Sequence, residues 1–225
     1  MEQNITLLRK EIVDAGKRVY DRGFVASNDG NISARIDAKR ALITPTGVSK
    51  GFMRPEDLII VDMDGNLVSG DRKPSSETNM HLQIYKDRPD VNSVCHAHPP
   101  YSTGFAVAGF NMDKMLLPEV IISLGVIPLV EYGTTGTEEL YAQIKRYIQD
   151  YDALLLANHG ALTVGTSVLN AYHKMETLEH AAKIQFIAQQ LGKVNELNGK
   201  QSDQLIELRG KFGIRKDLGL KGRKK

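Results

Sequence analysis

The sequence contains one cysteine, Cys95, so no disulfide can form within the chain. That composition favours a reducing compartment. No apolar stretch approaches the roughly 18 residues that a membrane-spanning helix needs. Residues 1–24 are amphipathic, unlike the continuously apolar centre of a secretory signal. We therefore expect a cytoplasmic protein without a membrane partner.

The chain also carries little net charge. A formal charge of +2 gives no reason to expect a nucleic-acid partner. With 225 residues, 41% apolar and 25% charged, the chain resembles one soluble globular domain spanning residues 1–225. Basic residues gather between 211 and 225. We expect residues from about 192 to 225 to form a solvated basic tail, part of which could be disordered.

Apolar spacing and capping residues predict helices at 5–22, 75–86, 99–108, 137–151 and 167–191. Shorter apolar runs predict strands at 32–36, 41–44, 58–62, 66–69, 91–98, 153–157 and 161–164. The stretch 116–130 is apolar but broken by proline and glycine, which favours strand and loop pieces. A regular strand–helix–strand rhythm is not sustained, so we predict an α/β domain with a mostly antiparallel sheet.

Three histidines are candidate metal ligands. His96 and His98 are two positions apart on a predicted strand, so both side chains point to one face and Cys95 points to the other. His159 follows an apolar strand and precedes Gly160, where the chain needs freedom to turn. Three neutral imidazoles with an open fourth position suit zinc and other late divalent metals. Each histidine taken alone could equally be a polar group at a strand end.

Glu77 is the candidate catalytic carboxylate. It lies where a loop led by Pro74 meets a predicted helix, and unpaired N–H groups at a helix start favour an anion. Ser75 and Ser76 add hydroxyl donors for a phosphate, although a plain helix cap has the same composition. His81, four positions after Glu77, could support the site, but we expect it to be solvent-exposed.

Two polar turns, at 28–33 and 44–47, complete the pattern. Each offers glycine and amide or hydroxyl groups of the kind that bind anions. Together with the histidines, they resemble the class II aldolase and adducin head-domain family over residues 5–190. The motifs that carry the resemblance, in chain order, are Gly30-Asn31-Ile32-Ser33, Thr44-Pro45-Thr46-Gly47, Lys73-Pro74-Ser75-Ser76-Glu77, His96-Ala97-His98 and Asn158-His159-Gly160.

The resemblance implies a three-layer α/β/α sandwich that assembles as a homotetramer with active sites between subunits. It implies zinc, or another divalent metal, as the cofactor. The implied metal ligands are His96, His98, His159 and, in the resting enzyme, Glu77. The implied phosphate-binding residues are Asn31, Thr46, Gly47, Ser75 and Ser76.

The implied reaction is the reversible aldol cleavage of a ketose 1-phosphate, of the L-fuculose 1-phosphate type, to dihydroxyacetone phosphate and a small aldehyde. The metal would act as a Lewis acid and stabilise an enediolate, while Glu77 would exchange the C3 proton. Family aldolases use a tyrosine near positions 116–122. No tyrosine lies there in this chain, and Glu119 is the predicted proton donor to the aldehyde oxygen.

Other chemistries of the family remain open. A ribulose-phosphate 4-epimerase would cleave and re-form the same bond, but such enzymes carry aspartate where Glu77 stands. Dehydration or decarboxylation of a phosphorylated sugar is also compatible with these residues. An adducin-like scaffold would not require the three histidines together with Glu77, so their joint presence favours a lyase.

Overall fold

The protein folds around one eight-stranded sheet, in the order β4-β3-β2-β1-β5-β8-β7-β6. The computed structural model describes residues 4–214, 217 and 219–220. Neighbouring strands pair antiparallel except β6 and β7, which are parallel. This confirms the predicted mostly antiparallel sheet. The strands are β1 Asn31–Arg35, β2 Arg40–Ile43, β3 Ile59–Asp62, β4 Leu67–Ser69, β5 Ser93–Ala97, β6 Leu129–Val130, β7 Ala153–Leu156 and β8 Gly160–Gly165.

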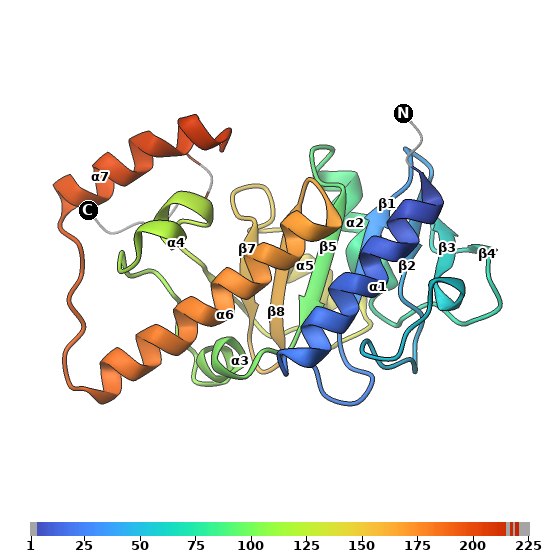
Figure 1. The fold of residues 1–225 in the computed structure, drawn as a ribbon, viewed down its shortest axis with the longest axis horizontal. Helices are drawn as coiled ribbons and strands as arrows, with labels where there is room; N and C mark the ends of the chain where they lie inside the picture. Colours follow the sequence, from blue (N-terminus) through green and yellow to red (C-terminus); the bar gives the residue numbers. More distant parts are fainter. Residues whose placement is uncertain (1–3, 215–216, 218, 221–225) are drawn as a thin grey trace.

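Helices cover both faces of the sheet, which makes three layers (Figure 1). α1, α3 and α6 pack on one face, while α2 and α5 pack on the other. In the described part of the chain, no helix is both long enough and apolar enough to cross a membrane. The α-helices are α1 Ile5–Asp21, α2 Thr78–Asp87, α3 Pro100–Val107, α4 Pro118–Ser123, α5 Glu138–Ile144, α6 Val168–Gln190 and α7 Gly199–Leu208, with 3-10 turns at Pro55–Asp57 and Arg209–Phe212.

Capping residues fix the two longest helices where the sequence predicts them. The Asn4 side chain accepts a hydrogen bond from the Leu7 amide at the start of α1. α1 then ends before Gly23, which adopts φ 69°. Ser167 caps α6 in the same way, accepting from the Asn170 amide at 3.2 Å.

Three helical segments differ from the predictions. α5 ends at Ile144 and not near 151, because the Arg146 and Tyr147 amides donate to carbonyls three residues back and form turns. α4 forms where strand and loop pieces were expected, because Pro118 occupies a first-turn position that needs no N–H and Gly125 (φ 78°) follows the helix end. α2 begins at Thr78, later than the predicted start near Ser75. The reason is a turn over the preceding residues, in which the Thr78 amide donates to the Ser75 carbonyl at 3.0 Å.

The expected basic tail contains a helix. Asn198 and Gln201 cap α7 reciprocally. α7 lies against α4 at one end of the molecule (Figure 1), and Leu205 and Ile206 pack on the core. Residues 215–216, 218 and 221–225 of the expected tail lie outside the described part of the chain.

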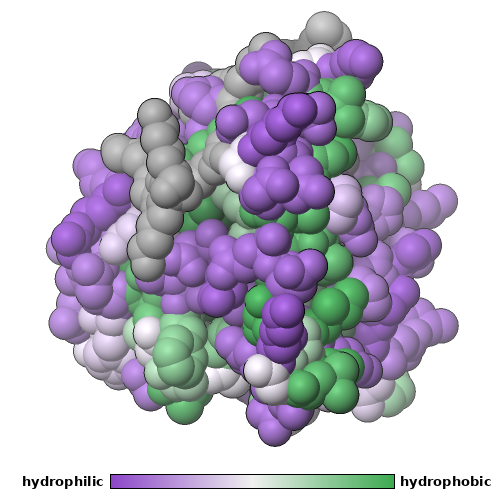
Figure 2. All heavy atoms as spheres, turned by 90° about the vertical axis from the view of Figure 1, so that its left-hand side faces the viewer, coloured by the Kyte–Doolittle hydropathy of each residue, from purple (hydrophilic) through white to green (hydrophobic). Residues whose placement is uncertain are grey.

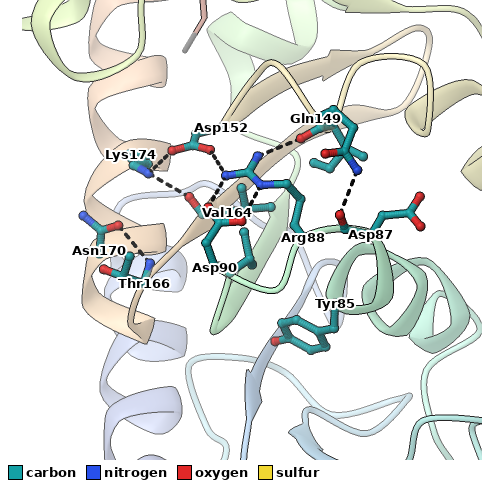
Figure 3. A network of polar contacts seen from close by, with 12 residues as sticks. Tyr85, Asp87, Arg88, Asp90, Gln149, Asp152, Val164, Thr166, Asn170 and Lys174 are labelled. Atoms are coloured by element: carbon teal, nitrogen blue, oxygen red, sulfur yellow. Dashed lines mark hydrogen bonds and ion pairs between the residues drawn. The ribbon is translucent and has the colours of Figure 1, made fainter. Parts of the chain in front are cut away.

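A buried ion network joins α2, β7 and α6 (Figure 3). Arg88, 4% exposed, contacts Asp152 at 3.0 Å and Asp90 at 2.7 Å. Lys174 donates to Asp152 at 2.5 Å and to the Val164 carbonyl at 3.0 Å. Asp152 precedes β7, so this network fixes the end of the sheet opposite to the one where the candidate ligands lie.

Candidate functional site

The three predicted histidines meet at one end of the sheet. His96 lies at the end of β5, His98 just after it, and His159 in the turn between β7 and β8. Their ring centroids are 4.6 to 5.1 Å apart. One ligand atom from each lies within 4.8 Å of the others. Among the described residues, this is the one cluster of histidine, cysteine or acidic side chains that could hold a metal ion.

The hydrogen bonds orient His96 for metal binding. Its Nδ1 lies 2.9 Å from the Ala161 carbonyl, so Nδ1 carries the proton and Nε2 keeps its lone pair. The Nε2 atoms of His96 and His98 are 3.2 Å apart. Ligands bound about 2.1 Å from one tetrahedral zinc lie roughly 3.4 Å apart, so this spacing fits a shared ion.

Burial keeps the cluster neutral. It lowers the pKa of His159 to about 4, and the neighbouring His96 acts in the same direction. Burial also lowers the pKa of His98. Neutral imidazoles are the form that binds a metal. Cys95 points to the opposite face, into the core under α1 and α6, and burial raises the pKa of its thiol to about 12. This confirms that Cys95 is a poor ligand.

Glu77 lies directly beside the cluster. Its Oε2 is 3.3 Å from His96 Nε2, and its Oε1 is 3.3 Å from His159 Nε2. Burial opposes ionisation of the carboxyl group. The imidazoles of His96 and His159, in the protonated form that they take at low pH, and a hydrogen bond from Asn31 outweigh it and lower the pKa to about 2. Oε1 is buried and accepts no hydrogen bond. A divalent cation would give that oxygen a partner, so the residues present fit a metal.

A buried chain of hydrogen bonds stands behind Glu77. Asn31 donates from Nδ2 to Glu77 Oε2 at 2.7 Å, and its Oδ1 lies 2.5 Å from His81 Nε2. His81 Nδ1 contacts the Ser33 hydroxyl at 2.7 Å, and that hydroxyl contacts Tyr85 at 2.6 Å. Asn31 Oδ1 can only accept, so His81 carries its proton on Nε2 and fixes the orientation of the amide.

The prediction that His81 is exposed is therefore wrong. The side chain is completely buried, and burial lowers its pKa to about 3. Ser33 lies on β1 while His81 and Tyr85 lie on α2, so only the packing of α2 on the sheet brings them together. Spacing along the helix alone could not indicate this.

The polar turns line a cavity of about 330 Å³ next to Glu77. The turn at 44–47 is joined to the loop at 73–77 by a hydrogen bond from the Thr46 amide to the Lys73 carbonyl. His98 and His159 also line this cavity. All the candidate phosphate-binding residues line it: Asn31, Thr46, Gly47, Ser75 and Ser76.

One lining residue, Thr135, lies outside the segments selected from the sequence, and Asp29 was not singled out within the turn at 28–33. Asp29 Oδ2 lies 3.6 Å from His98 Nδ1. Thr135 comes from the turn before α5, which passes so close that a Cβ on Gly136 would lie 3.2 Å from Ser76 Cβ. The run Gly133-Thr-Thr-Gly136 has the composition of the other two turns, which is the sequence signal that could have revealed it.

Two glycines are required by close approach. Gly30 has φ 71°, and a Cβ there would lie 2.8 Å from the His96 carbonyl oxygen. A Cβ on Gly160 would lie 2.6 Å from His98 Cδ2. The turn after β7 instead takes its positive φ, 54°, at Asn158. Gly160 therefore provides space for the ligand cluster and not the turn itself.

Glu119 is not near this cavity within one chain. It is exposed on α4 and lines a different cavity of about 550 Å³, formed with residues of α3 and α6. The structure therefore brings Glu77 and the histidines together and leaves Glu119 apart.

Comparison with known proteins agrees with this geometry. Residues 10–186 match the family described as class II aldolase and adducin N-terminal domain. An L-fuculose phosphate aldolase from Methanococcus maripaludis is 38% identical over 80% of this chain and 97% of that relative. A 3-oxo-tetronate 4-phosphate decarboxylase from Haemophilus influenzae is 35% identical over 81% of this chain and 89% of that relative.

The fold agrees as well. The solved structure of YgbL from Klebsiella pneumoniae, described as a candidate aldolase, epimerase or decarboxylase, superposes with a TM-score of 0.84. It is 28% identical and covers 90% of this chain and 99% of that one. The chain therefore belongs to the family of class II aldolases and adducin heads, as one of its lyases.

Proposed function

We propose that the protein is a cytoplasmic, zinc-dependent aldolase that reversibly cleaves a ketose 1-phosphate, of the L-fuculose 1-phosphate type, to dihydroxyacetone phosphate and a small aldehyde. The observation that carries the proposal is the place of Glu77. Its carboxylate lies 3.3 Å from two imidazole nitrogens of the cluster, at the wall of a cavity whose lining includes amide and hydroxyl groups. Proton transfer next to a metal-polarised carbonyl needs such a carboxylate.

Zinc is the ion that we propose for the histidine cluster, with Glu77 as a fourth ligand in the resting enzyme. Three imidazoles and a carboxylate form a donor set that suits zinc, and other late divalent ions can compete for it. When bound, the ion supplies a Lewis acid for the substrate carbonyl and for the negative charge that develops during cleavage.

Glu77 would move the proton at C3. Its pKa of about 2 means that the free carboxylate is ionised at neutral pH and can accept a proton. Asn31 Nδ2 donates a hydrogen bond to Glu77 Oε2, whereas Glu77 Oε1 accepts none. Oε1 is therefore the oxygen available to the metal or the substrate. In the synthetic direction Glu77 removes the C3 proton of dihydroxyacetone phosphate. In cleavage, after the C3–C4 bond breaks, it returns a proton to C3 of the enediolate.

The phosphate would lie on the rim of the cavity. Ser75, half-buried, and Ser76, exposed, present hydroxyl groups, and the turn at 44–47 adds the Thr46 side chain and the backbone of Gly47. Asn31 lies between this rim and Glu77, with Nδ2 3.4 Å from Ser75 Oγ. Binding at the rim would place C3 beside Glu77, because dihydroxyacetone phosphate is only three carbons long.

We also propose a homotetramer with active sites between subunits. Exposed apolar side chains at the ends of α3 and α6, including Phe110, Phe186 and Leu191, support an interface between copies. Figure 2 shows apolar residues exposed among hydrophilic ones on the face with α7 and the end of α6. In such an assembly Glu119 could reach a neighbouring site and protonate the aldehyde oxygen.

Decarboxylation of a phosphorylated 3-oxo sugar acid is the second candidate. The decarboxylase relative from Haemophilus influenzae supports it. The sequence supports it too, since no tyrosine lies between Tyr101 and Tyr132 to act as an aldolase proton donor. Loss of carbon dioxide also leaves electrons beside a carbonyl, so the same metal and Glu77 would serve.

One screen separates the two candidates. The metal-loaded enzyme is incubated with a panel of ketose 1-phosphates and, separately, with 3-oxo-tetronate 4-phosphate. Release of dihydroxyacetone phosphate from a ketose 1-phosphate, with identification of the aldehyde, is the expected result. Release of carbon dioxide from the acid without any retro-aldol activity would overturn the aldolase proposal in favour of the decarboxylase.

A further inference from the structure

The cavity beside Glu77 lacks a positive side chain. Among the described residues that line it, none is a lysine or an arginine, and two, Asp29 and Glu77, are acidic. A phosphate monoester carries close to two negative charges at neutral pH. Neutral amides and hydroxyls can bind its oxygens, but they do not balance that charge. A compensating cation must therefore act from beyond the lining residues or come with the metal.

Lys50 lies immediately behind the cavity wall. Its side chain is 2% exposed, and Nζ donates to the Asn28 carbonyl at 2.9 Å and to the Val48 carbonyl at 2.8 Å. Asn28 itself lines the cavity, and Val48 follows the lining residue Gly47. The ammonium group thus joins the two turns from behind, and their other side faces the proposed phosphate.

Helix α1 closes the space around Lys50. A Cβ on Gly16 would lie 3.1 Å from the Lys50 carbonyl oxygen and 3.0 Å from the Met53 methyl group. These contacts bring no charge to the lysine. Asp29 is the one charged group among the described residues that acts on Lys50, and it acts through space while its carboxylate faces His98.

The charge of Lys50 is therefore only partly compensated. An ammonium group has three N–H donors, and the two hydrogen bonds are made to neutral carbonyls. Burial lowers the pKa of Lys50 to about 8, against the opposing effect of Asp29. An anion bound on the far side of the wall would favour the charged form and raise this pKa.

We propose that Lys50 is a positioning residue that holds the turn at 28–33 and the turn at 44–47, through the adjoining Val48, together and supplies the buried counter-charge for the substrate phosphate. The inference rests on the proposed function insofar as it needs a phosphate group in this cavity. Because the ammonium group acts from behind the wall, it strengthens phosphate binding without touching the substrate.

Two consequences are measurable. Removing the charge should weaken binding of a phosphate monoester roughly 10- to 100-fold, since a buried charge close to a dianion is poorly screened. Binding at pH 8 should also be accompanied by uptake of about half a proton, because a lysine with a pKa near 8 is half-protonated in the free enzyme. At pH 6 the uptake by Lys50 should vanish.

Glycerol 1-phosphate is the probe, because it carries the phosphate ester but no carbonyl group. Isothermal titration calorimetry of the metal-loaded enzyme, repeated in buffers of different ionisation enthalpy, gives both affinity and proton uptake. Lys50→Met should lose affinity and the uptake at pH 8. Lys50→Arg should keep affinity and lose the uptake. Lys39→Met, which removes an exposed lysine in the turn between β1 and β2, is the matched control and should change affinity less than about twofold.

The outcomes separate the two proposals. If the wild-type enzyme binds glycerol 1-phosphate without proton uptake at pH 8, and Lys50→Met binds it equally well, the role of Lys50 is refuted while the phosphate site stands. If the wild-type enzyme does not bind the probe at all, the phosphate site fails and the inference fails with it. If Lys50→Met does not fold, the pH dependence of wild-type binding tests the role of Lys50. The affinity of the wild-type enzyme for glycerol 1-phosphate should then fall as the pH rises above 8, and an unchanged affinity would refute the role.

Discussion

Replacement of Glu77 by glutamine isolates the proton-transfer role of this side chain. Glutamine keeps the size of the side chain and one carbonyl oxygen, which can still accept from Asn31 Nδ2 at the 2.7 Å position of Oε2. The amide nitrogen then takes the place of Oε1, 3.3 Å from His159 Nε2. The cavity and the orientation of Asn31 should persist, while the ability to accept a proton is lost.

The magnitude of the effect can be divided into two parts. A positioned general base contributes about 10²- to 10⁴-fold to a proton transfer, which corresponds to about 2.7 to 5.5 kcal/mol. Loss of a carboxylate next to the histidines should separately weaken metal binding, roughly 10- to 100-fold. The variant must therefore be studied at a metal concentration that saturates it.

Exchange of the C3 proton of dihydroxyacetone phosphate with deuterium oxide, followed by proton NMR, measures the step that Glu77 performs. Glu77→Gln with one bound metal ion per chain should exchange about 10²- to 10⁴-fold more slowly than the wild type. Glu138→Gln, which changes an exposed glutamate at the start of α5, should exchange at the wild-type rate. Exchange by metal-loaded Glu77→Gln within tenfold of the wild type would refute Glu77 as the base.

Three further predictions concern binding and stability. Alanine at both Ser75 and Ser76 should raise KM at least tenfold for phosphorylated substrates only, and an equal loss on unphosphorylated sugars would reject these residues as phosphate ligands. Burial lowers the pKa of His81 from 6.5 in the unfolded chain to about 3 in the folded protein. Below pH 6.5 the unfolded state therefore binds a proton that the folded state does not, and the free energy of unfolding falls as the pH falls towards 3. Between pH 7 and 4 the metal-free wild type should therefore lose about 3 kcal/mol more unfolding free energy than His81→Gln, and equal losses in urea titrations would contradict this. Asp152→Ala leaves the buried Arg88 without one carboxylate partner and should cost about 3 to 5 kcal/mol in thermal unfolding, whereas a loss under 1 kcal/mol would show that the network in Figure 3 contributes little.

Strand alternation was enough to predict that His96 and His98 lie on one face of the sheet. Because side chains alternate along β5, His96 and His98 had to share a face and Cys95 had to point away, as the structure confirms. The two longest helices could also be predicted from local signals. Apolar spacing and Gly23 predicted α1, while Ser167 at the start and Gly192 at the end predicted α6. These signals are local, and the fold did not override them.

The features that could not be predicted depend on contacts between distant segments. His81 is buried because Ser33 and Asn31 on β1 meet it, and no feature of α2 alone shows this. Glu77 precedes the first turn of α2, and its side chain lies 3.3 Å from His96 on β5, a contact between distant segments. Lys50 looks like an ordinary surface lysine in the sequence, and only the two turns and α1 reveal its burial.

X-ray absorption at the zinc edge tests the metal centre most directly. On protein reconstituted with one equivalent of zinc, it should report three imidazole nitrogens and one oxygen at about 2.0 to 2.1 Å. His98→Ala should lose one of these nitrogens. Zinc bound by fewer than three imidazoles in the wild type, or no stoichiometric binding at all, would contradict a metal site formed by His96, His98 and His159 beside Glu77.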